Sequence, residues 1–288
     1  MAGFLIKICR VAVISGSFLV SALPPVAGGT ESAVTAPVRV GVLPYLSPKA
    51  LMTTWAPLVE YLETILNRPA QLVTAPDFAT FAARSLADQY DIVLTAPHFA
   101  VLIVRKRGYR PLVMFAKELY GDVVVARHAG YRSLSDLKHQ IVVMPDRLAI
   151  VSALGEQLFR RTGIDVYHDL SIQYVSSHND AMMAVVQGRA AAAVTAFGLS
   201  RHLPASLGSS LRVLASTSRV PHGMALLHPA LGEADYRRLK SRLRSTAMSG
   251  DLAAHIASLG WGALVEVDAA TMARLISRFS RFDGVVPP

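Results

Sequence analysis

The sequence is poor in cysteine and in charge, and each shortage excludes a class of protein. Cys9 is the only cysteine among 288 residues, so the chain cannot form an internal disulfide framework. Charged residues make up 17% of the chain and hydrophobic residues 52%, which is the opposite of the composition of a disordered protein. The length predicts about two domains, each large enough to bury its own core.

Long hydrophobic runs are also missing beyond residue 29. No later stretch reaches the roughly 18 consecutive apolar residues expected of a transmembrane helix. Near the start, Lys7 and Arg10 precede an uncharged, mostly apolar run from Val11 to Leu23, and small residues follow it. This order is typical of a secretory signal peptide. We predict that residues 1–28 are removed on export; an uncleaved membrane anchor is the alternative.

The excess of basic residues is compatible with several kinds of partner. The formal net charge is +9, and it falls to +7 when Lys7 and Arg10 leave with the signal. A basic chain attracts nucleic acid, anionic lipid or small anions. The basic residues are scattered without interleaved aromatic rings, and export argues further against nucleic acid. Charge alone leaves anionic lipid and a small anion open as partners, and a mature chain without cysteine suits an oxidising compartment.

Short apolar runs alternate with amphipathic stretches along the mature chain. The predicted strands are 38–44, 70–75, 91–97, 110–117, 121–127, 141–146, 171–177, 190–197 and 211–217. The predicted helices are 51–66, 78–87, 98–107, a short turn at 133–137, 150–162, 179–187, 232–246, 248–258 and 268–280. Strands that alternate with helices indicate mostly parallel sheets covered on both faces. We predict an α/β protein with two lobes, formed by residues 38–118 plus 219–288 and by residues 119–218.

Candidate ligand contacts follow the predicted strands, because open α/β sheets bind ligands beyond the carboxyl ends of their strands. Several of these positions also begin helices, whose free N–H groups and positive dipole suit an anion. The candidates are Tyr45, Thr95, His98, Tyr120, Arg147, Ser177 and His178.

Three of these candidates have a plain structural alternative. His178 could instead be an exposed residue in the first turn of a helix that Ser177 caps. His98 could be a packed core histidine. Arg147 could be an ordinary surface arginine, although its guanidinium is also suited to a bidentate contact with a carboxylate or phosphate.

Enzyme motifs are missing from the sequence. It contains no GxSxG elbow, no P-loop, no GxGxxG dinucleotide motif, and no HExxH or Cys/His cluster. We therefore expect a protein that is not an enzyme, with no catalytic residue, no cofactor and no metal site.

Several segments, taken in order, resemble the type II periplasmic substrate-binding proteins, and most of all their phosphate, phosphite and phosphonate-binding (PhnD-like) branch. The segments are GVLPYLSP (41–48), WAPLVEYLETIL (55–66), APDFATFAARSLADQYDIVLTAP (75–97), ELYGDVVVARHAGYRSLSDLKHQIVVMPD (118–146), SSHNDAMMAVVQGRAAAAV (176–194) and SLGW (258–261). The resemblance spans about residues 38–280.

The resemblance implies two lobes joined by two crossover strands that close over a ligand by a hinge motion. It implies an anionic phosphorus ligand delivered to an ABC permease in the inner membrane, and it places Tyr45, Thr95, Tyr120 and His178 in the cleft. The Ser-Thr-Ser run of the family is absent, because residues 146–152 read DRLAIVS. We expect a monomer, and a sensing protein that partners a membrane kinase is the alternative function.

Overall fold

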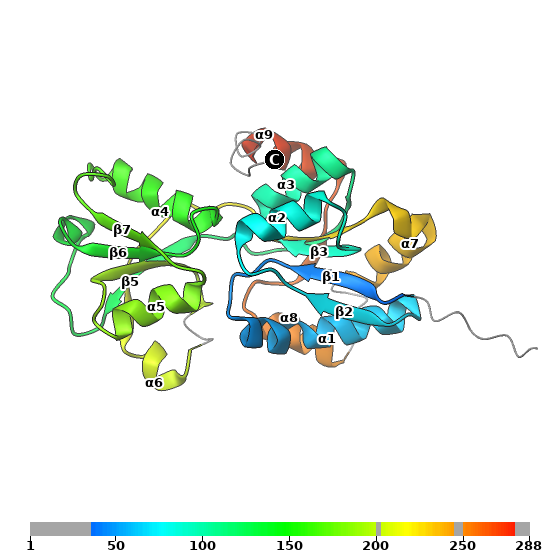
Figure 1. Ribbon diagram of the computed structural model, residues 1–288, viewed down its shortest axis with the longest axis horizontal. Coiled ribbons are helices and arrows are strands. Elements are labelled where there is room, and N and C mark those ends of the chain that lie inside the picture. Colours follow the sequence, from blue (N-terminus) through cyan, green and yellow to red (C-terminus); the bar gives the residue numbers. More distant parts are fainter. Residues whose placement is uncertain (1–35, 200–202, 245–249, 280–288) are drawn as a thin grey trace, which may run out of the picture. The chain divides into compact units, whose positions relative to one another are not determined.

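The computed structural model describes residues 36–199, 203–244 and 250–279, which form two β-sheets flanked by helices (Figure 1). The predicted signal peptide, residues 1–28, lies outside the described residues. Within the described part of the chain, no helix combines the length and apolarity needed to cross a membrane.

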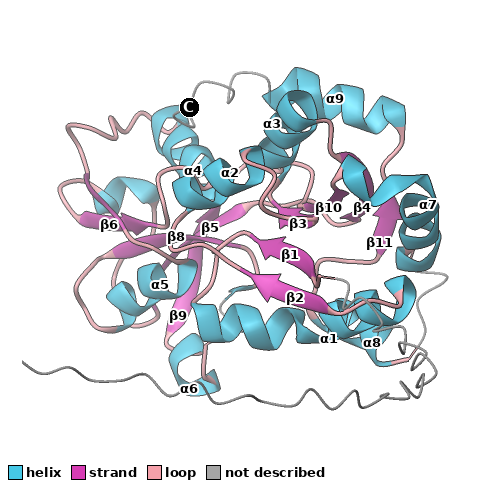
Figure 2. Cartoon of the chain, turned by 45° about the vertical axis from the view of Figure 1, so that its right-hand side comes forward, coloured by secondary structure: helices cyan, strands magenta, loops and turns pink. Residues whose placement is uncertain are grey.

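The first sheet has six strands in the order β11-β4-β10-β3-β1-β2. Helices α2, α3 and α9 lie on one face of it, and α1 and α8 lie on the other (Figure 2). Its strands are β1 (Val38–Val42), β2 (Ala70–Val73), β3 (Ile92–Thr95), β4 (Arg110–Phe115), β10 (Met224–Leu227) and β11 (Leu264–Glu266). Its helices are α1 (Pro48–Leu66), α2 (Phe78–Leu86), α3 (Pro97–Arg107), α7 (Gly232–Leu243), α8 (Asp251–Ser258) and α9 (Ala269–Phe279).

The second sheet has five strands in the order β7-β6-β8-β5-β9, with α4 on one face and α5 on the other (Figures 1 and 2). Its strands are β5 (Gly121–Ala126), β6 (Ile141–Met144), β7 (Ser171–Tyr174), β8 (Ala192–Ala196) and β9 (Leu211–Ser216). Its helices are α4 (Ile150–Arg161), α5 (His178–Val186) and α6 (Ala205–Gly208), and a 3-10 turn, η1, spans Leu134–Leu137.

Both sheets are mixed. In the first sheet β1 pairs in parallel with β2 and β3, whereas β10 runs antiparallel between β3 and β4. In the second sheet β6 pairs in parallel with β7 and β8, whereas β5 runs antiparallel between β8 and β9. The α/β prediction is confirmed, and the antiparallel strands add pairings that alternating helices and strands alone do not predict.

Helix capping explains why several boundaries agree with the sequence prediction. The Asp77 carboxylate accepts the Thr80 N–H at 2.6 Å and begins α2. The Ser177 hydroxyl accepts the Asp180 N–H at 3.1 Å and begins α5. Each cap satisfies one of the N–H groups that a helix start leaves without an intrahelical acceptor.

Two connections link the two sheets, one from β4 to β5 and one from β9 to β10. They meet at Leu119 and Val220, which exchange two backbone hydrogen bonds of 2.7 and 2.8 Å in an antiparallel bridge. The chain therefore crosses between the sheets as a paired ribbon rather than as two separate loops. The lobe boundaries at residues 118 and 219 stay a prediction.

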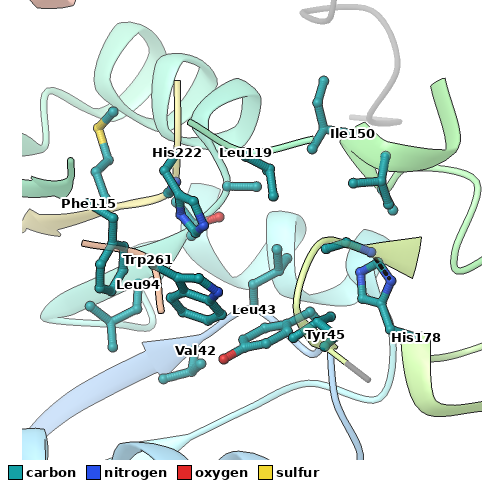
Figure 3. Close-up of a pocket in the computed structure, with 18 of the residues that line it drawn as sticks. Val42, Leu43, Tyr45, Leu94, Phe115, Leu119, Ile150, His178, His222 and Trp261 are labelled. Atoms are coloured by element: carbon teal, nitrogen blue, oxygen red, sulfur yellow. Dashed lines mark hydrogen bonds between the residues drawn. The ribbon is translucent and has the colours of Figure 1, made fainter. Parts of the chain in front are cut away.

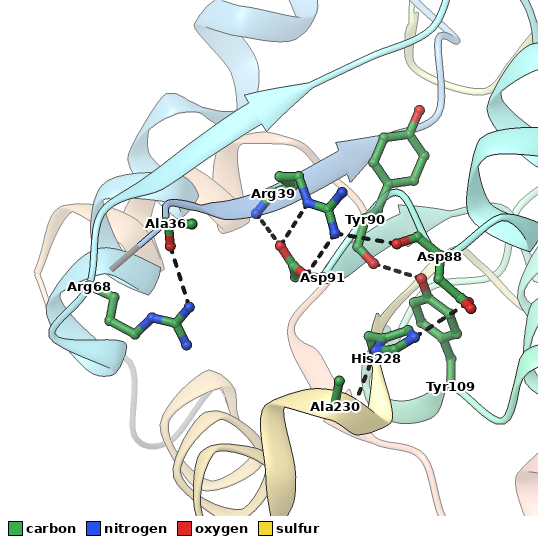
Figure 4. Close-up of polar contacts among 9 residues, drawn as sticks. All are labelled: Ala36, Arg39, Arg68, Asp88, Tyr90, Asp91, Tyr109, His228 and Ala230. Carbon is green, nitrogen blue, oxygen red and sulfur yellow. Dashed lines mark hydrogen bonds and ion pairs between the residues drawn. The ribbon is translucent and has the colours of Figure 1, made fainter. Parts of the chain in front are cut away.

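An ion-pair network joins the starts of β1 and β3, at the end of these strands away from the cavity-side residues Val42 and Thr95 (Figure 4). Arg39 of β1 donates its backbone N–H to Asp91 at 2.7 Å and two guanidinium N–H groups at 3.1 Å each. Asp88 accepts from Arg107 and lies 3.4 Å from His228. Burial acts to raise the pKa of Asp91, but the hydrogen bonds from Arg39 outweigh it and hold that pKa below its usual value.

Replacing Asp91 with Asn removes a charged acceptor for which Arg39 supplies three donors. We expect Asp91→Asn to lower the free energy of unfolding by about 1 kcal/mol at pH 7. Because the folded pKa of Asp91 is depressed, its contribution is present above the unfolded pKa of about 4 and is lost as pH falls through the folded value. Urea unfolding of both proteins should therefore show a smaller difference at pH 3 than at pH 7. Glu118→Gln, at an exposed site, is the control, and a difference independent of pH would contradict the assignment.

Gly41 is the second-to-last residue of β1, and it lies against the buried ring of Tyr90. A Cβ at this position would overlap the ring atoms of Tyr90, which is 1% exposed and stacks on Phe81. We expect Gly41→Ala to lower the free energy of unfolding by about 1–3 kcal/mol, because Tyr90 has no room to shift. Gly130→Ala is the matched control, since nothing lies within 4 Å of the added carbon there. Equal denaturation midpoints for the two variants would contradict this packing account.

Candidate functional site

A cavity of about 90 Å³ lies where strands of both sheets end (Figure 3). Its wall includes Val42 at the end of β1, Thr95 at the end of β3 and Ala196 at the end of β8. The starts of α2, α3, α4 and α5 contribute Phe78, Ala96, Ala149 to Val151 and His178 to the wall. This is the strand-end position at which open α/β sheets bind ligands.

Four aromatic rings form one side of the cavity, which we call the ring cage: Tyr45, Trp55, Phe115 and Trp261. The Phe115 and Trp261 rings meet edge to face with centroids 5.0 Å apart, and Trp261 lies 5.9 Å from Tyr45 and 6.2 Å from Trp55. The Trp55 indole N–H donates to the Tyr45 hydroxyl at 3.1 Å. Burial raises the pKa of Tyr45, so its hydroxyl stays neutral.

Two buried histidines complete the wall. His178 Nδ1 accepts the Ala196 N–H at 3.2 Å, and His222 Nδ1 accepts the Gly223 N–H at 2.8 Å. A neutral imidazole whose Nδ1 is an acceptor carries its proton on Nε2. Burial lowers the pKa of each ring to about 3, so both are neutral hydrogen-bond donors near pH 7.

Hydrogen bonds between elements of the two sheets surround the cavity. The His178 N–H donates to the Tyr45 carbonyl at 3.3 Å, and His98 Nε2 lies 3.0 Å from the Leu148 carbonyl oxygen. Asp146, which precedes α4, accepts the N–H of Phe78 at the start of α2 at 3.4 Å. The cavity is therefore walled by contacts from both sheets.

The structure brings together three of the seven candidates from the sequence. Tyr45, Thr95 and His178 line the cavity. His98 is not among the lining residues; it is 4% exposed, and its ring centroid lies 4.2 Å from that of Phe99. Ser177 is the cap of α5. The ligand role of each residue stays a prediction.

The other two candidates lie outside the cavity wall. The guanidinium of Arg147 packs 4.5 Å from the centre of the Tyr174 ring. Tyr120 stacks on Phe197 at 4.5 Å and lies under the Arg219 guanidinium. Both side chains are held by cation–π or stacking partners rather than by the cavity.

Most residues of the wall are not among the sequence candidates, and four of them carry rings that shape the cavity: Trp55, Phe115, His222 and Trp261. Trp55 falls in the predicted helix 51–66 and Phe115 in the predicted strand 110–117. Trp261 belongs to the SLGW segment, and His222 lies just before β10, a strand that the sequence pattern does not predict. A search for aromatic residues near strand ends would have found Phe115, but the partners of Trp261 are far apart in sequence.

Comparison with known proteins identifies the family. Residues 40–272 match the family described as the periplasmic substrate-binding protein of the phosphonate ABC transporter. The chain belongs to this family. The predicted family, the periplasmic-binding-protein fold and the function as a substrate-binding component of a phosphonate ABC transporter are thereby confirmed. Members of the family are periplasmic transport proteins rather than enzymes.

Solved structures share this fold at low sequence identity. A binding-protein component of an ABC phosphonate transporter from Pseudomonas aeruginosa is 16% identical, with a TM-score of 0.74, over 87% of this chain and 89% of that chain. PhnD1 from Prochlorococcus marinus, in complex with methylphosphonate, is 14% identical, with a TM-score of 0.75, over 85% and 97%. A histidine kinase sensor domain with similarity to periplasmic binding proteins is 14% identical, with a TM-score of 0.55, over 81% and 98%.

The two neutral histidines of the cavity make the free energy of unfolding depend on pH below about 6.5. Burial lowers the pKa of His178 and His222 from about 6.5, the value expected in the unfolded chain, to about 3 in the folded protein. The unfolded state therefore binds more protons between these values, and the free energy of unfolding falls as pH drops from about 6.5 toward 3. The slope is at most about 1.4 kcal/mol per pH unit for each histidine.

We expect His222→Gln to give a shallower fall in the free energy of unfolding between pH 6.5 and 4 than the wild type. Urea denaturation at several pH values measures the slope independently of any constant effect of the substitution. His128→Gln, at an exposed histidine, is the control. Parallel curves for wild type and His222→Gln would show that His222 titrates normally in the folded protein.

Proposed function

We propose that this protein is exported through removal of residues 1–28, captures a small ligand in the cavity between its two sheets, and delivers it as a monomer to an ABC permease in the inner membrane. The observation that carries the proposal is the cavity itself, which residues from the strand ends of both sheets wall together. Nucleic-acid binding and catalysis form no part of the proposed role.

The ribbon of the two connections supports a hinge. We propose that residues 38–118 with 219–288 form one lobe and residues 119–218 the other, as the sequence predicts. The connections cross between these lobes at one place, where Leu119 and Val220 pair. A rotation there would separate the two halves of the cavity wall without breaking either sheet.

Tyr45, Thr95 and His178 are the proposed ligand contacts among the sequence candidates, because their side chains reach the cavity wall. His178 combines a neutral Nε2–H donor with a place in the first turn of α5. The ligand roles of His98, Tyr120, Arg147 and Ser177 stay predictions from the sequence, and none of these residues lines the cavity.

Sensing is the alternative function. The similar histidine kinase sensor domain shows that the same fold occurs in a sensor, and fold alone does not decide between transport and sensing. A permease gene beside this gene would favour import, and a sensor-kinase gene would favour signalling.

A thermal-shift screen of residues 29–288 tests capture directly. Its panel contains phosphate, phosphite, methylphosphonate, aminoethylphosphonate, phenylphosphonate, sulfate and simple carboxylates. A ligand at 100 times its dissociation constant adds about 2.7 kcal/mol of stability, so we expect a clear rise in melting temperature for at least one organic phosphonate. His178→Ala should weaken the binding of that ligand by about 1–2 kcal/mol, the cost of a lost hydrogen bond. Tyr167→Ala, at a side chain that is 75% exposed, should leave its binding unchanged. A panel without any stabilising compound would contradict capture of this ligand class.

A further inference from the structure

The cavity wall contains no counter-charge for a strongly anionic ligand. Among the described residues that line it, none is Lys, Arg, Asp or Glu. Its two histidines are neutral. A buried charge without a partner is expensive in free energy, so a doubly charged head group would lose its hydration without an ionic replacement.

The protein's own carboxylates occupy N–H groups at the helix starts around the cavity. Asp146 accepts the N–H of Phe78 at 3.4 Å and the N–H of Leu148 at 2.8 Å, so one carboxylate joins the starts of α2 and α4. Asp77 accepts the N–H of Thr80 in the first turn of α2. These backbone N–H groups would otherwise be available to an anionic ligand. The carboxylates that occupy them also repel such a ligand.

Two buried polar atoms in the wall have no hydrogen-bond partner among the described residues: Thr95 Oγ1 and His222 Nε2. Both residues are 6% exposed and line the cavity. Since His222 Nδ1 is an acceptor, its Nε2 carries a proton and can only donate. An unpaired buried donor costs free energy, and the oxygen atoms of a ligand head group can accept from each of these groups.

The ring cage faces the same space. Figure 3 shows Trp261 between Phe115 and Tyr45, with its indole nitrogen on the side of Leu43. Flat rings around an apolar space favour a flat or compact hydrocarbon group. The cavity of about 90 Å³ is smaller than the roughly 150 Å³ apolar cavity that admits benzene in another protein, so a ring-sized body fits only when the two halves of the wall move apart at the proposed hinge.

We infer that this pocket selects its ligand by an apolar, ring-sized organic body packed in the ring cage, with a head group of at most one negative charge whose oxygen atoms accept from Thr95 and His222. The inference rests on the proposed function and adds the ligand class to it. Within phosphonate chemistry, the preferred ligands are arylphosphonate monoesters, and arylphosphonates in their singly protonated form, rather than inorganic phosphate or methylphosphonate.

Tryptophan fluorescence measures this preference at the cavity itself. The chain contains two tryptophans, Trp55 and Trp261, and both line the cavity. Titrations of the purified protein would compare four probes: phosphate, methylphosphonate, phenylphosphonate and the monomethyl ester of phenylphosphonate. We expect phenylphosphonate to bind roughly tenfold or more tightly than methylphosphonate, because a buried ring adds apolar area. The monoester should bind at least as tightly as phenylphosphonate.

Three variants separate the contribution of the ligand's apolar body to affinity from the contribution of its head group. Trp261→Leu should shrink the advantage of phenylphosphonate over methylphosphonate, while Thr95→Val should weaken all organic probes alike. Asp146→Asn should improve binding of phosphate and methylphosphonate relative to the monoester, because it removes the repelling carboxylate. Tyr167→Ala, at its exposed site, should preserve the wild-type order.

The outcomes distinguish this inference from the proposed function. If phosphate or methylphosphonate binds as tightly as phenylphosphonate, and His178→Ala weakens that binding, the cavity captures ligands but the inference is overturned. If no probe changes the fluorescence at millimolar concentration, both the inference and the proposed function are contradicted. The predicted order, lost in Trp261→Leu, supports both.

Discussion

The cost of removing polar groups from water is the constraint on which this site depends. Strands of two sheets and the starts of four helices converge on one cavity, and each brings backbone donors into a region with little solvent. The protein satisfies many of these donors internally, with Asp77 and Asp146 at helix starts and with His178 at the end of β8. What is left for a ligand is an apolar space with few unpaired polar atoms.

The rings of the cage serve both stability and recognition. Trp55 and Trp261 are 3% and 6% exposed, and they belong to the core that also supports the first sheet. The Trp55 indole donates a hydrogen bond to the Tyr45 hydroxyl, and the Tyr45 carbonyl accepts the backbone N–H of His178 at the start of α5. Tyr45 therefore links the ring cage to α5. Packing of the first sheet therefore determines the shape of the ligand cavity, and it does so with residues that lie far apart in the sequence.

Local signals made much of the fold predictable. The predicted helix 78–87 begins where the Asp77 cap begins α2, and the predicted strand 38–44 begins at the first residue of β1. The strand at 224–227 was missed because four apolar residues after Pro221 and Gly223 carry no periodic pattern of their own. Its place between β3 and β4 comes from tertiary pairing, which a local pattern does not contain.

The candidate site was predictable in position but not in character. Strand ends indicate Tyr45, Thr95 and His178, because the carboxyl ends of parallel strands share one edge, and these three residues line the cavity. The apolar nature of the cavity depends on Phe115 and Trp261, which meet only in the folded chain. Arg147, the one cation expected at the ligand, packs on Tyr174 instead of lining the cavity.

The heat-capacity change of ligand binding tests the central claim most directly. Calorimetric titration of phenylphosphonate at several temperatures, repeated at low and high salt, separates apolar burial from charge pairing. Apolar recognition predicts a clearly negative heat-capacity change and an affinity that salt hardly alters. A heat-capacity change near zero, with an affinity that falls steeply as salt is raised, would show that charge governs this site and would contradict the account.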